Sequence, residues 1–218
     1  MSGEGSKEEL RPLAQFCKAK GLEWDSQREE RFGLYLELLV KFNEAMNLIG
    51  PMGREEVVET LLLDSIVAAA ARAPRGPILD VGTGAGLPGI PLKILYPELP
   101  IALVEPRQKR SNFLKLATHR LGFEEVELAR CRIEDFEGRD FDTVISKAFE
   151  APTKWLRTAY PRLREPGGAV LCMARRKDLV ELEEVARELR LERVGAAEAP
   201  RATQAEDGED RVVYAFQR

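Results

Sequence analysis

Long hydrophobic runs, cysteine and histidine are scarce in this sequence of 218 residues. No run of about 18 apolar residues is present, so we expect no membrane-spanning helix. Cys17, Cys131 and Cys172 are odd in number and far apart, which argues against a zinc knuckle or a disulfide framework. Residues 1–10 lack the basic-then-apolar order of a signal peptide. These absences predict a reduced, cytoplasmic protein that binds neither a membrane nor a metal.

Catalytic groups of the common hydrolytic kinds are also missing. The only histidine, His119, lies in LKLATHRLG, where we interpret it as an ordinary helix residue. No Ser/His/Asp arrangement and no carboxylate pair with catalytic spacing is visible. The sequence therefore offers no obvious general base.

The net charge of −4 and the isoelectric point near 5.4 argue against a protein that coats nucleic acid indiscriminately. Two local basic clusters stand out against this background, RQKR at 107–110 and ARRK at 174–177. Each cluster, taken alone, is consistent with a solvated helix start or loop tip. The overall charge therefore does not exclude local binding of an anionic partner by these clusters.

Helical periodicity dominates roughly the first 70 residues. In REERFGLYLELLVKFNEAMN, residues 28–47, apolar side chains recur every three or four positions, as in an amphipathic helix. A second helix is predicted over residues 55–72, and NLIGPMGR before it has the glycine and proline of a loop. APRGP at 73–77 marks a boundary, so we predict an N-terminal helical segment over residues 1–73.

From residue 74 to residue 218, short apolar runs alternate with helical segments. ILDVG, IALVE, VELARC, TVISKAF and AVLCMA suit buried parallel strands. This alternation predicts an α/β fold with a doubly wound, mostly parallel sheet. The tail DRVVYAFQR is typical of a last strand, which we expect to be antiparallel at the edge of the sheet.

The glycine-rich stretch LDVGTGAGLPGIPLK, residues 79–93, fits two cofactor motifs. Gly84-x-Gly86-x-x-Gly89 is a dinucleotide fingerprint, whereas Asp80-x-Gly82-x-Gly84-x-Gly86 is typical of S-adenosyl-L-methionine sites. In either case Gly82 allows a sharp turn after the strand, Gly84 a close approach to the ligand, and Gly86 close packing of the next helix. The glycines alone do not choose between the motifs.

Two acidic residues bear on this choice, and one of them, Asp80, favours S-adenosyl-L-methionine. Asp80 lies inside an apolar strand, where a carboxylate is unfavourable unless it meets donors or a cation. The ammonium and sulfonium of S-adenosyl-L-methionine would satisfy Asp80, whereas the pyrophosphate of a dinucleotide would repel it. Alternatively, Asp80 caps backbone amides of its own glycine loop, which is compatible with the same cofactor. Glu105, at the end of the second strand, fits the ribose hydroxyls of either cofactor.

Several consecutive motifs of the sequence resemble those of a known protein family. NEAMNLIG, LLLDSIV, ILDVGTGAGLPGIPLKI, LVEPRQKRSNFL, RIEDF and FDTVISKAF follow one another as in the glucose-inhibited division protein B family. The resemblance covers residues 30 to 150 and is strongest from Ile78 to Leu92. Members of that family are bacterial methyltransferases that act on a guanine N7 of small-subunit ribosomal RNA. The resemblance therefore implies a Rossmann-like, S-adenosyl-L-methionine-dependent methyltransferase whose partner is 16S ribosomal RNA or the small subunit.

The resemblance also implies roles for individual residues. Gly82 and Leu87 would line the methionine and ribose side of the pocket, and Ile133 and Glu134 would lie beside the adenine. Lys147 follows VIS, where the family usually has an arginine near the cofactor and the target base; it is the expected catalytic residue, in a positioning role. The expected cofactor-binding residues are Asp80, Gly82, Thr83, Gly84, Leu87, Glu105, Ile133, Glu134 and Lys147. Asn47 and Arg175 are the expected substrate-binding residues.

Three sites depart from the family's usual residues. Leu61 stands where the family usually has a histidine. Ala174 and Arg175 stand in place of a Lys-Gly pair, and Asp210 and Arg211 in place of an Arg-His pair. Arg175 and Arg176 are candidates to replace the missing lysine.

These departures fall on expected RNA contacts, so other functions stay open. One alternative is a methyltransferase of the same fold that acts on another RNA or on a small molecule. Another is a non-catalytic module that binds RNA or the ribosome. A nicotinamide oxidoreductase is disfavoured by Asp80.

Overall fold

A seven-stranded sheet lies at the centre of the computed structural model, which describes residues 8–198, 200 and 210–218. Its strands follow the order β3-β2-β1-β4-β5-β7-β6. Their bounds are β1 Ile78–Val81, β2 Ile101–Val104, β3 Val126–Ala129, β4 Thr143–Ser146, β5 Ala169–Arg175, β6 Glu192–Glu198 and β7 Arg211–Gln217. The first five strands are parallel, and β7 is antiparallel to both of its neighbours. The strand order reverses at β1 and β4, which is where open α/β sheets bind their ligands.

The five predicted parallel strands and the predicted antiparallel tail strand are confirmed. The predicted place of the tail strand at the edge is wrong, because β6 pairs with the outer side of β7 and forms the edge. Strand β6 was not predicted because its residues, ERVGAAE, are mostly exposed and form no apolar run. An edge strand of this kind lacks the pattern by which a buried strand is recognised.

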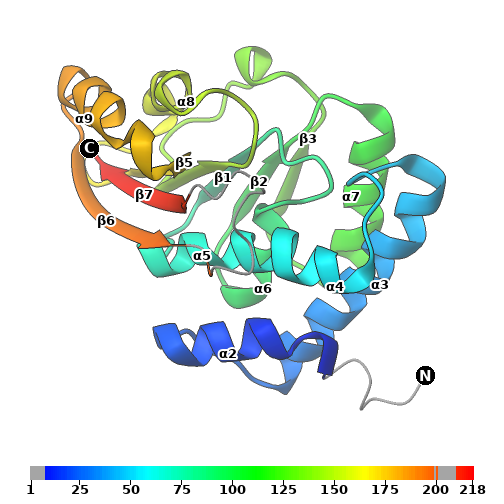
Figure 1. The fold of residues 1–218 in the computed structure, drawn as a ribbon. Coiled ribbons are helices and arrows are strands. Elements are labelled where there is room, and N and C mark those ends of the chain that lie inside the picture. The colour runs from blue at the N-terminus through cyan, green and yellow to red at the C-terminus, as the bar shows by residue number, and fades with distance from the viewer. Residues whose placement is uncertain (1–7, 199, 201–209) are drawn as a thin grey trace.

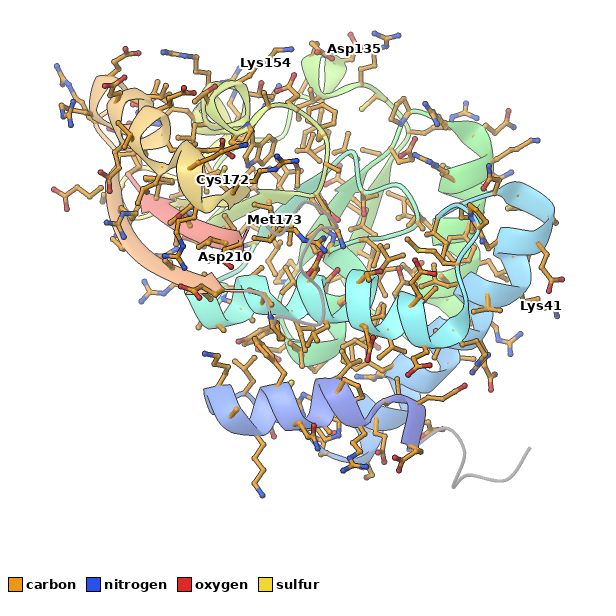
Figure 2. All side chains as sticks on the ribbon, in the orientation of Figure 1. Lys41, Asp135, Lys154, Cys172, Met173 and Asp210 are labelled. Atoms are coloured by element: carbon orange, nitrogen blue, oxygen red, sulfur yellow. The ribbon has the colours of Figure 1, made fainter. Side chains whose placement is uncertain are left out.

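Two layers of helices cover the sheet (Figure 1). On one face lie α5 Leu63–Ala71, α6 Gly89–Leu95 and α7 Gln108–Arg120, whose apolar side chains form one core cluster with the inward-facing strand residues. On the other face, α8 Pro152–Ala159 and α9 Leu179–Glu188 form the second cluster. Charged side chains such as Lys41 and Lys154 project outward from opposite layers (Figure 2). The doubly wound α/β prediction is therefore confirmed.

The N-terminal helices extend the first of these layers. They are α2 Arg11–Lys20, α3 Ser26–Met46 and a continuous helical stretch made of α4 Arg54–Glu56, η1 Val57–Leu62 and α5. The helices predicted over residues 28–47 and 55–72 are confirmed with small shifts of their ends. The stretch η1 is a π-helix, which the sequence did not indicate. Shorter turns are η2 Ile133–Asp135, η3 Tyr160–Arg162 and η4 Arg176–Asp178.

The hydrophobic core continues across the predicted boundary between residues 73 and 74. Helix α5 contacts both β6 and β7, and α2 packs beneath α5 (Figure 1). One core cluster contains residues of α2, α3, α5, α6 and α7. The N-terminal segment is therefore packed as part of the α/β core, and the division of the chain between residues 73 and 74 stays a prediction.

Residues 1–7, on which the expectation about a signal peptide mainly rests, lie outside the described residues. In the part of the chain that the structure describes, no helix is long and apolar enough to cross a membrane. Within the same part, no group of three or more His, Cys, Asp or Glu side chains could hold a metal ion.

Candidate active site

The glycine loop begins where β1 ends and runs to the start of α6. Gly82 has the left-handed φ of 66°, and its amide donates to the carbonyl of Val104 at 2.9 Å. This conformation is readily accessible to glycine alone, so the sharp turn predicted after the strand is present. The loop lies at the carboxyl end of β1, between the carboxyl ends of β2 and β4.

Asp80 is fully buried beneath this loop. Its Oδ2 accepts hydrogen bonds from the Thr83 hydroxyl at 2.5 Å and from the Gly89 amide at 2.8 Å. Burial raises the pKa of the Asp80 carboxyl to about 7, while the two hydrogen bonds act to lower it. The geometry thus favours the alternative hypothesis, in which Asp80 caps its own glycine loop. Asp80 and Thr83 fix the loop from below, and a direct contact of either with cofactor stays a prediction.

Glu105 follows β2, and its carboxylate contacts the same loop at Gly84. Its carboxylate accepts from the amides of Gly84 at 3.1 Å and Arg107 at 2.8 Å, and Arg110 Nη1 lies 3.8 Å away. A carboxylate offers about four acceptor positions, so two remain after these bonds. Glu105 can therefore hold the loop and still accept the two hydroxyls of a ribose.

Close packing occurs at Gly89, the first residue of α6, as well as at Gly86. A Cβ added to Gly89 would lie 2.5 Å from Leu103 Cδ2 and 2.6 Å from Asp80 Oδ2, both on neighbouring strands. Gly86 lies against both α6 and α3, because an added Cβ would lie 2.4 Å from Ile90 Cδ1 on α6 and 3.1 Å from the hydroxyl of Tyr35 on α3. Close packing of the next helix therefore uses both glycines: Gly86 makes room for a side chain of α6, and Gly89 lets the backbone of α6 approach the strands.

Helix α3 supports the loop from behind, which the sequence analysis did not foresee. The buried Tyr35 donates its hydroxyl hydrogen to the carbonyl of Ala85 at 2.8 Å. The guanidinium of Arg28 donates to the carbonyl of Leu95 at the end of α6. Tyr35 lies in the predicted apolar stripe of α3, but no local pattern distinguishes it from a core aromatic residue.

Leu87, Ile133 and Glu134 lie on two separate segments at the carboxyl ends of strands. Leu87 is buried within the loop itself. Ile133 and Glu134 belong to η2, which follows β3, and there Ile133 is buried while Glu134 is exposed. A buried apolar side chain next to an exposed acidic one suits an adenine face and its polar edge, so their expected roles stay predictions.

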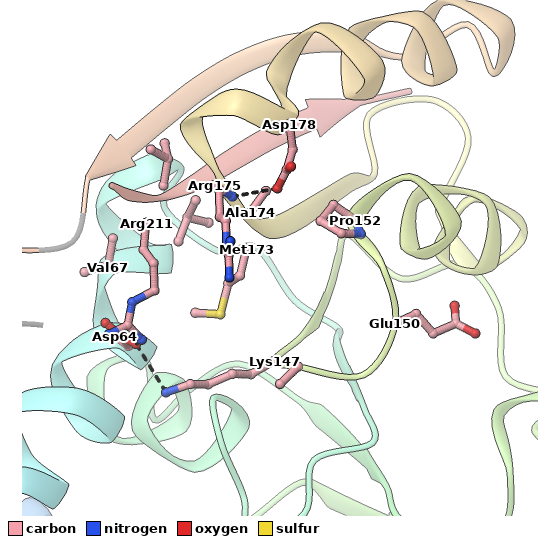
Figure 3. Close-up of a pocket in the computed structure, with 13 residues that line it drawn as sticks. Asp64, Val67, Lys147, Glu150, Pro152, Met173, Ala174, Arg175, Asp178 and Arg211 are labelled. Carbon is pink, nitrogen blue, oxygen red and sulfur yellow. Dashed lines mark hydrogen bonds and ion pairs between the residues drawn. The ribbon is translucent and has the colours of Figure 1, made fainter. Parts of the chain in front are cut away.

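A cavity of about 540 Å³ opens between the end of β4, the end of β5, the start of β7 and helix α5 (Figure 3). Lys147 enters it from the segment after β4, and its Nζ lies 3.6 Å from Asp64 Oδ2. Arg211 Nη1 donates to the same Asp64 oxygen at 2.7 Å. Two cations therefore converge on one buried carboxylate at the wall of the cavity.

The amine of Lys147 also contacts the π-helix. It donates to the carbonyls of Thr60 at 3.2 Å and Leu61 at 3.4 Å. Burial lowers the pKa of the Lys147 ammonium, and the nearby Asp64 carboxylate opposes that shift. Lys147 thus connects the end of β4 to the N-terminal helices, a structural task that the sequence analysis did not assign to it.

The residues that depart from the family pattern gather around this cavity. Ala174 and Arg175 line it from β5, and Leu61 supplies a carbonyl to Lys147 rather than a side chain. Asp210, labelled in Figure 2, pairs with Arg176 at 3.1 Å, and Arg176 also binds Glu198. Arg176 is thus committed to two acidic partners and does not line the cavity, whereas Arg175 does, which favours Arg175 as the substitute for the missing lysine.

Asn47 ends α3, with a left-handed φ of 49° and an exposed side chain. The neighbouring Asn43 fixes the chain beyond it, since its side chain binds the backbone of Ile49 and Gly50. This end of α3 packs against α7 through Phe42 and Phe113. The contribution of Asn47 to closing the site stays a prediction.

The loop fits S-adenosyl-L-methionine. An added Cβ at Gly84 would have no neighbour closer than Arg110 Nη1 at 3.6 Å, so the space over this residue is open to a ligand. Beside it, Glu105 keeps acceptor capacity for ribose hydroxyls. Asp80 Oδ1 is a buried acceptor without a hydrogen-bond partner in the described part of the chain, and it places negative potential beneath the loop.

Solved structures of similar fold include proteins with S-adenosylmethionine bound. Magnesium protoporphyrin IX methyltransferase from Synechocystis, solved with S-adenosylmethionine bound, aligns with a TM-score of 0.58 at 14% identity, over 90% of this chain and 99% of that one. TYW2 of M. jannaschii, solved in complex with the same cofactor, aligns with a TM-score of 0.54 at 14% identity, over 90% and 78%. At these identities the likeness shows the fold alone.

Sequence relatives are much closer. Ribosomal RNA small subunit methyltransferase G of Chromohalobacter salexigens is 42% identical over 166 residues, which are 76% of this chain and 78% of the relative. The protein of the same name from Streptococcus gordonii is 32% identical over 185 residues, or 81% and 78%. The family model described as rRNA small subunit methyltransferase G matches residues 28–209, which include the glycine loop and most of the cavity wall. The chain is therefore a member of the rRNA small subunit methyltransferase G family, and its class is that of the S-adenosyl-L-methionine-dependent methyltransferases.

Proposed function

We propose that this protein transfers a methyl group from S-adenosyl-L-methionine to N7 of a guanine in 16S ribosomal RNA of the small subunit. The observation that carries the proposal is a basic rim around the glycine loop. Basic residues follow four of the five parallel strands, and one more begins β7 at the same edge of the sheet. They are Arg107 and Lys109 after β2, Arg130 and Arg132 after β3, Lys147 after β4, Arg175 and Lys177 at the end of β5, and Arg211. Among these, Lys147 and Arg211 share the Asp64 carboxylate.

This rim contrasts with the chain as a whole, whose net charge is −4. Because parallel strands end at one edge of the sheet, these cations surround the opening where the cofactor loop lies. Phosphates of RNA bind such cations, and the affinity falls as the salt concentration rises. The concentration of positive charge at one edge of an acidic protein favours an RNA substrate over a small molecule.

The chemistry requires alignment rather than acid or base catalysis. When bound, S-adenosyl-L-methionine supplies the methyl group from its sulfonium. Guanine N7 already carries an exposed lone pair, so no side chain has to remove a proton before attack. Holding two reactants in line can by itself account for a large part of a rate enhancement. The residues of the rim and cavity position the RNA, and Glu105 and the glycine loop position the cofactor.

The test uses small ribosomal subunits that lack the methyl group, or RNA extracted from them, incubated with the protein and labelled S-adenosyl-L-methionine. The expected result is label in 16S RNA and a single new cleavage site after borohydride and aniline treatment, which report N7-methylguanine. The Gly84→Ala protein is the control for cofactor-independent signal. Label in another RNA or in small molecules would favour the alternative substrate. Salt-dependent RNA binding without methyl transfer would favour the non-catalytic module.

A further inference from the structure

We infer that Phe149 is a substrate-binding residue whose ring stacks on the target base beside the methyl donor. The inference rests on the proposed function and adds the side chain that holds the plane of the guanine. It is drawn from the segment 147–150, which follows β4 and separates the glycine loop from the cavity.

Phe149 lies directly on the glycine loop. A Cβ added to Gly82 would lie 2.5 Å from Cδ2 of Phe149, so the ring rests on the Gly82 backbone. Lys147 and Glu150, on either side of it in the sequence, line the cavity. The ring therefore stands where the loop expected to hold the methyl donor meets the cavity expected to receive the base.

The ring is accessible from this rim, with 37% of the residue exposed. The other exposed large apolar residues in the described part of the chain are Val180 on α9 and Val194 on β6. A single exposed apolar residue is ordinary on a protein surface. Phe149 differs because it is aromatic and because it lies against the cofactor loop.

The orientation of the ring is fixed from behind. Trp155 of α8 meets it edge on, with ring centroids 6.2 Å apart and an interplanar angle of 81°. Trp155 is itself buried and donates to the carbonyl of Leu171. Ala148, which precedes Phe149 in the sequence, has a left-handed φ of 53°, which is unfavourable for a residue with a Cβ. This turn sends Lys147 into the cavity and Phe149 onto the loop, and strained backbone of this kind concentrates at functional sites.

An aromatic surface at this place matches the needs of the reaction. A guanine in folded RNA is stacked on its neighbours, and proteins that contact such a base replace the lost stacking with an aromatic side chain. Methylation at N7 also gives the purine a positive charge, and the face of an aromatic ring attracts cations. One ring can therefore hold the base in line with the methyl donor and favour the charge that develops on it.

The experiment compares four proteins: the wild type, Phe149→Trp, Phe149→Leu and Phe149→Ala. For each, kcat/KM is measured on unmethylated small subunits, the affinity for S-adenosylhomocysteine by calorimetry, and the melting temperature. Phe149→Trp should methylate RNA close to the wild-type rate. Phe149→Leu, which keeps an apolar side chain on Gly82 but has no ring face, and Phe149→Ala should lower kcat/KM about 5- to 150-fold with unchanged affinity for S-adenosylhomocysteine. Val180→Ala is the control for loss of an exposed apolar side chain and should match the wild type.

Equal kcat/KM for the wild type and Phe149→Leu would overturn the inference, because packing alone would then suffice. A loss of S-adenosylhomocysteine affinity as large as the loss of transfer would also overturn it, since the ring would then serve the cofactor. A wild-type protein that methylates no RNA would instead overturn the proposed function.

Discussion

Two glycines of the same loop should respond in opposite ways to the addition of a methyl group. The space next to Gly84 is open, whereas Gly89, the first residue of α6, packs directly against the sheet. We predict that Gly84→Ala abolishes cofactor binding with little effect on stability, and that Gly89→Ala destabilises the fold. Both substitutions add one methyl group, so a difference between their effects shows which glycine contacts the cofactor and which one is needed for packing.

The magnitudes follow from the two environments. At Gly84 the φ of 60° makes a Cβ unfavourable by about 1–2 kcal/mol, which is partly offset by about 0.4–1 kcal/mol from the stiffer unfolded chain. At Gly89 the new Cβ would overlap Leu103 and Asp80, both fully buried, and overpacking of this kind costs about 1–3 kcal/mol. Displacing α6 would also weaken the bond from the Gly89 amide to the Asp80 carboxylate, for about 1.5–3 kcal/mol more.

Thermal unfolding with and without S-adenosylhomocysteine measures both effects. For a chain of this length, Gly89→Ala should lower the melting temperature by about 5–24 °C, and Gly84→Ala by less than about 7 °C. A ligand at a hundred times its dissociation constant adds about 2.7 kcal/mol, so the wild type should gain about 5–10 °C and Gly84→Ala almost nothing. A full ligand shift in Gly84→Ala would remove this residue from the cofactor site. A wild-type melting temperature for Gly89→Ala would refute the packing argument.

Three further predictions concern single side chains. The pKa of the Asp80 carboxyl rises from 3.8 to about 7 on folding, so ionised Asp80 opposes folding by about 4 kcal/mol, and this penalty grows between pH 4 and 7. In urea unfolding, the free energy of unfolding of Asp80→Asn relative to that of the wild type should therefore increase from pH 4 to pH 7 and stay constant above pH 7. A difference that does not change between pH 4 and pH 7 would contradict this. Lys147→Ala should abolish most methyl transfer and also lower the free energy of unfolding by about 1–3 kcal/mol, because buried carbonyls of η1 lose their donor, while Lys147→Arg should restore both. Arg175→Ala should weaken RNA binding and reduce its salt dependence more than Arg176→Ala in filter-binding assays, since Arg175 lines the cavity and Arg176 does not; equal effects would place both side chains on the RNA.

Local patterns in the sequence determined the architecture. The alternation of short apolar runs with helical segments predicted the doubly wound sheet, and the glycine loop with its acidic neighbours predicted the cofactor. Each of these signals lies within a few tens of residues, because a helix stripe, a buried strand and a sharp turn are properties of the local chain. The exposed edge strand β6 escaped because its side chains carry no apolar pattern.

The tertiary structure decided how residues far apart in the chain share the site. Tyr35 contacts the loop 50 positions later, and Arg211 reaches Asp64 across 147 positions. Whether Asp80 faces a cofactor or its own loop depends on where α6 begins, and this start set Gly89 rather than Gly86 against the sheet. Likewise, the placement of Phe149 on Gly82 arises from the pairing of β1 with β4 and from the turn at Ala148. Such contacts form only when separate elements pack together, and no periodicity or spacing within one element encodes them.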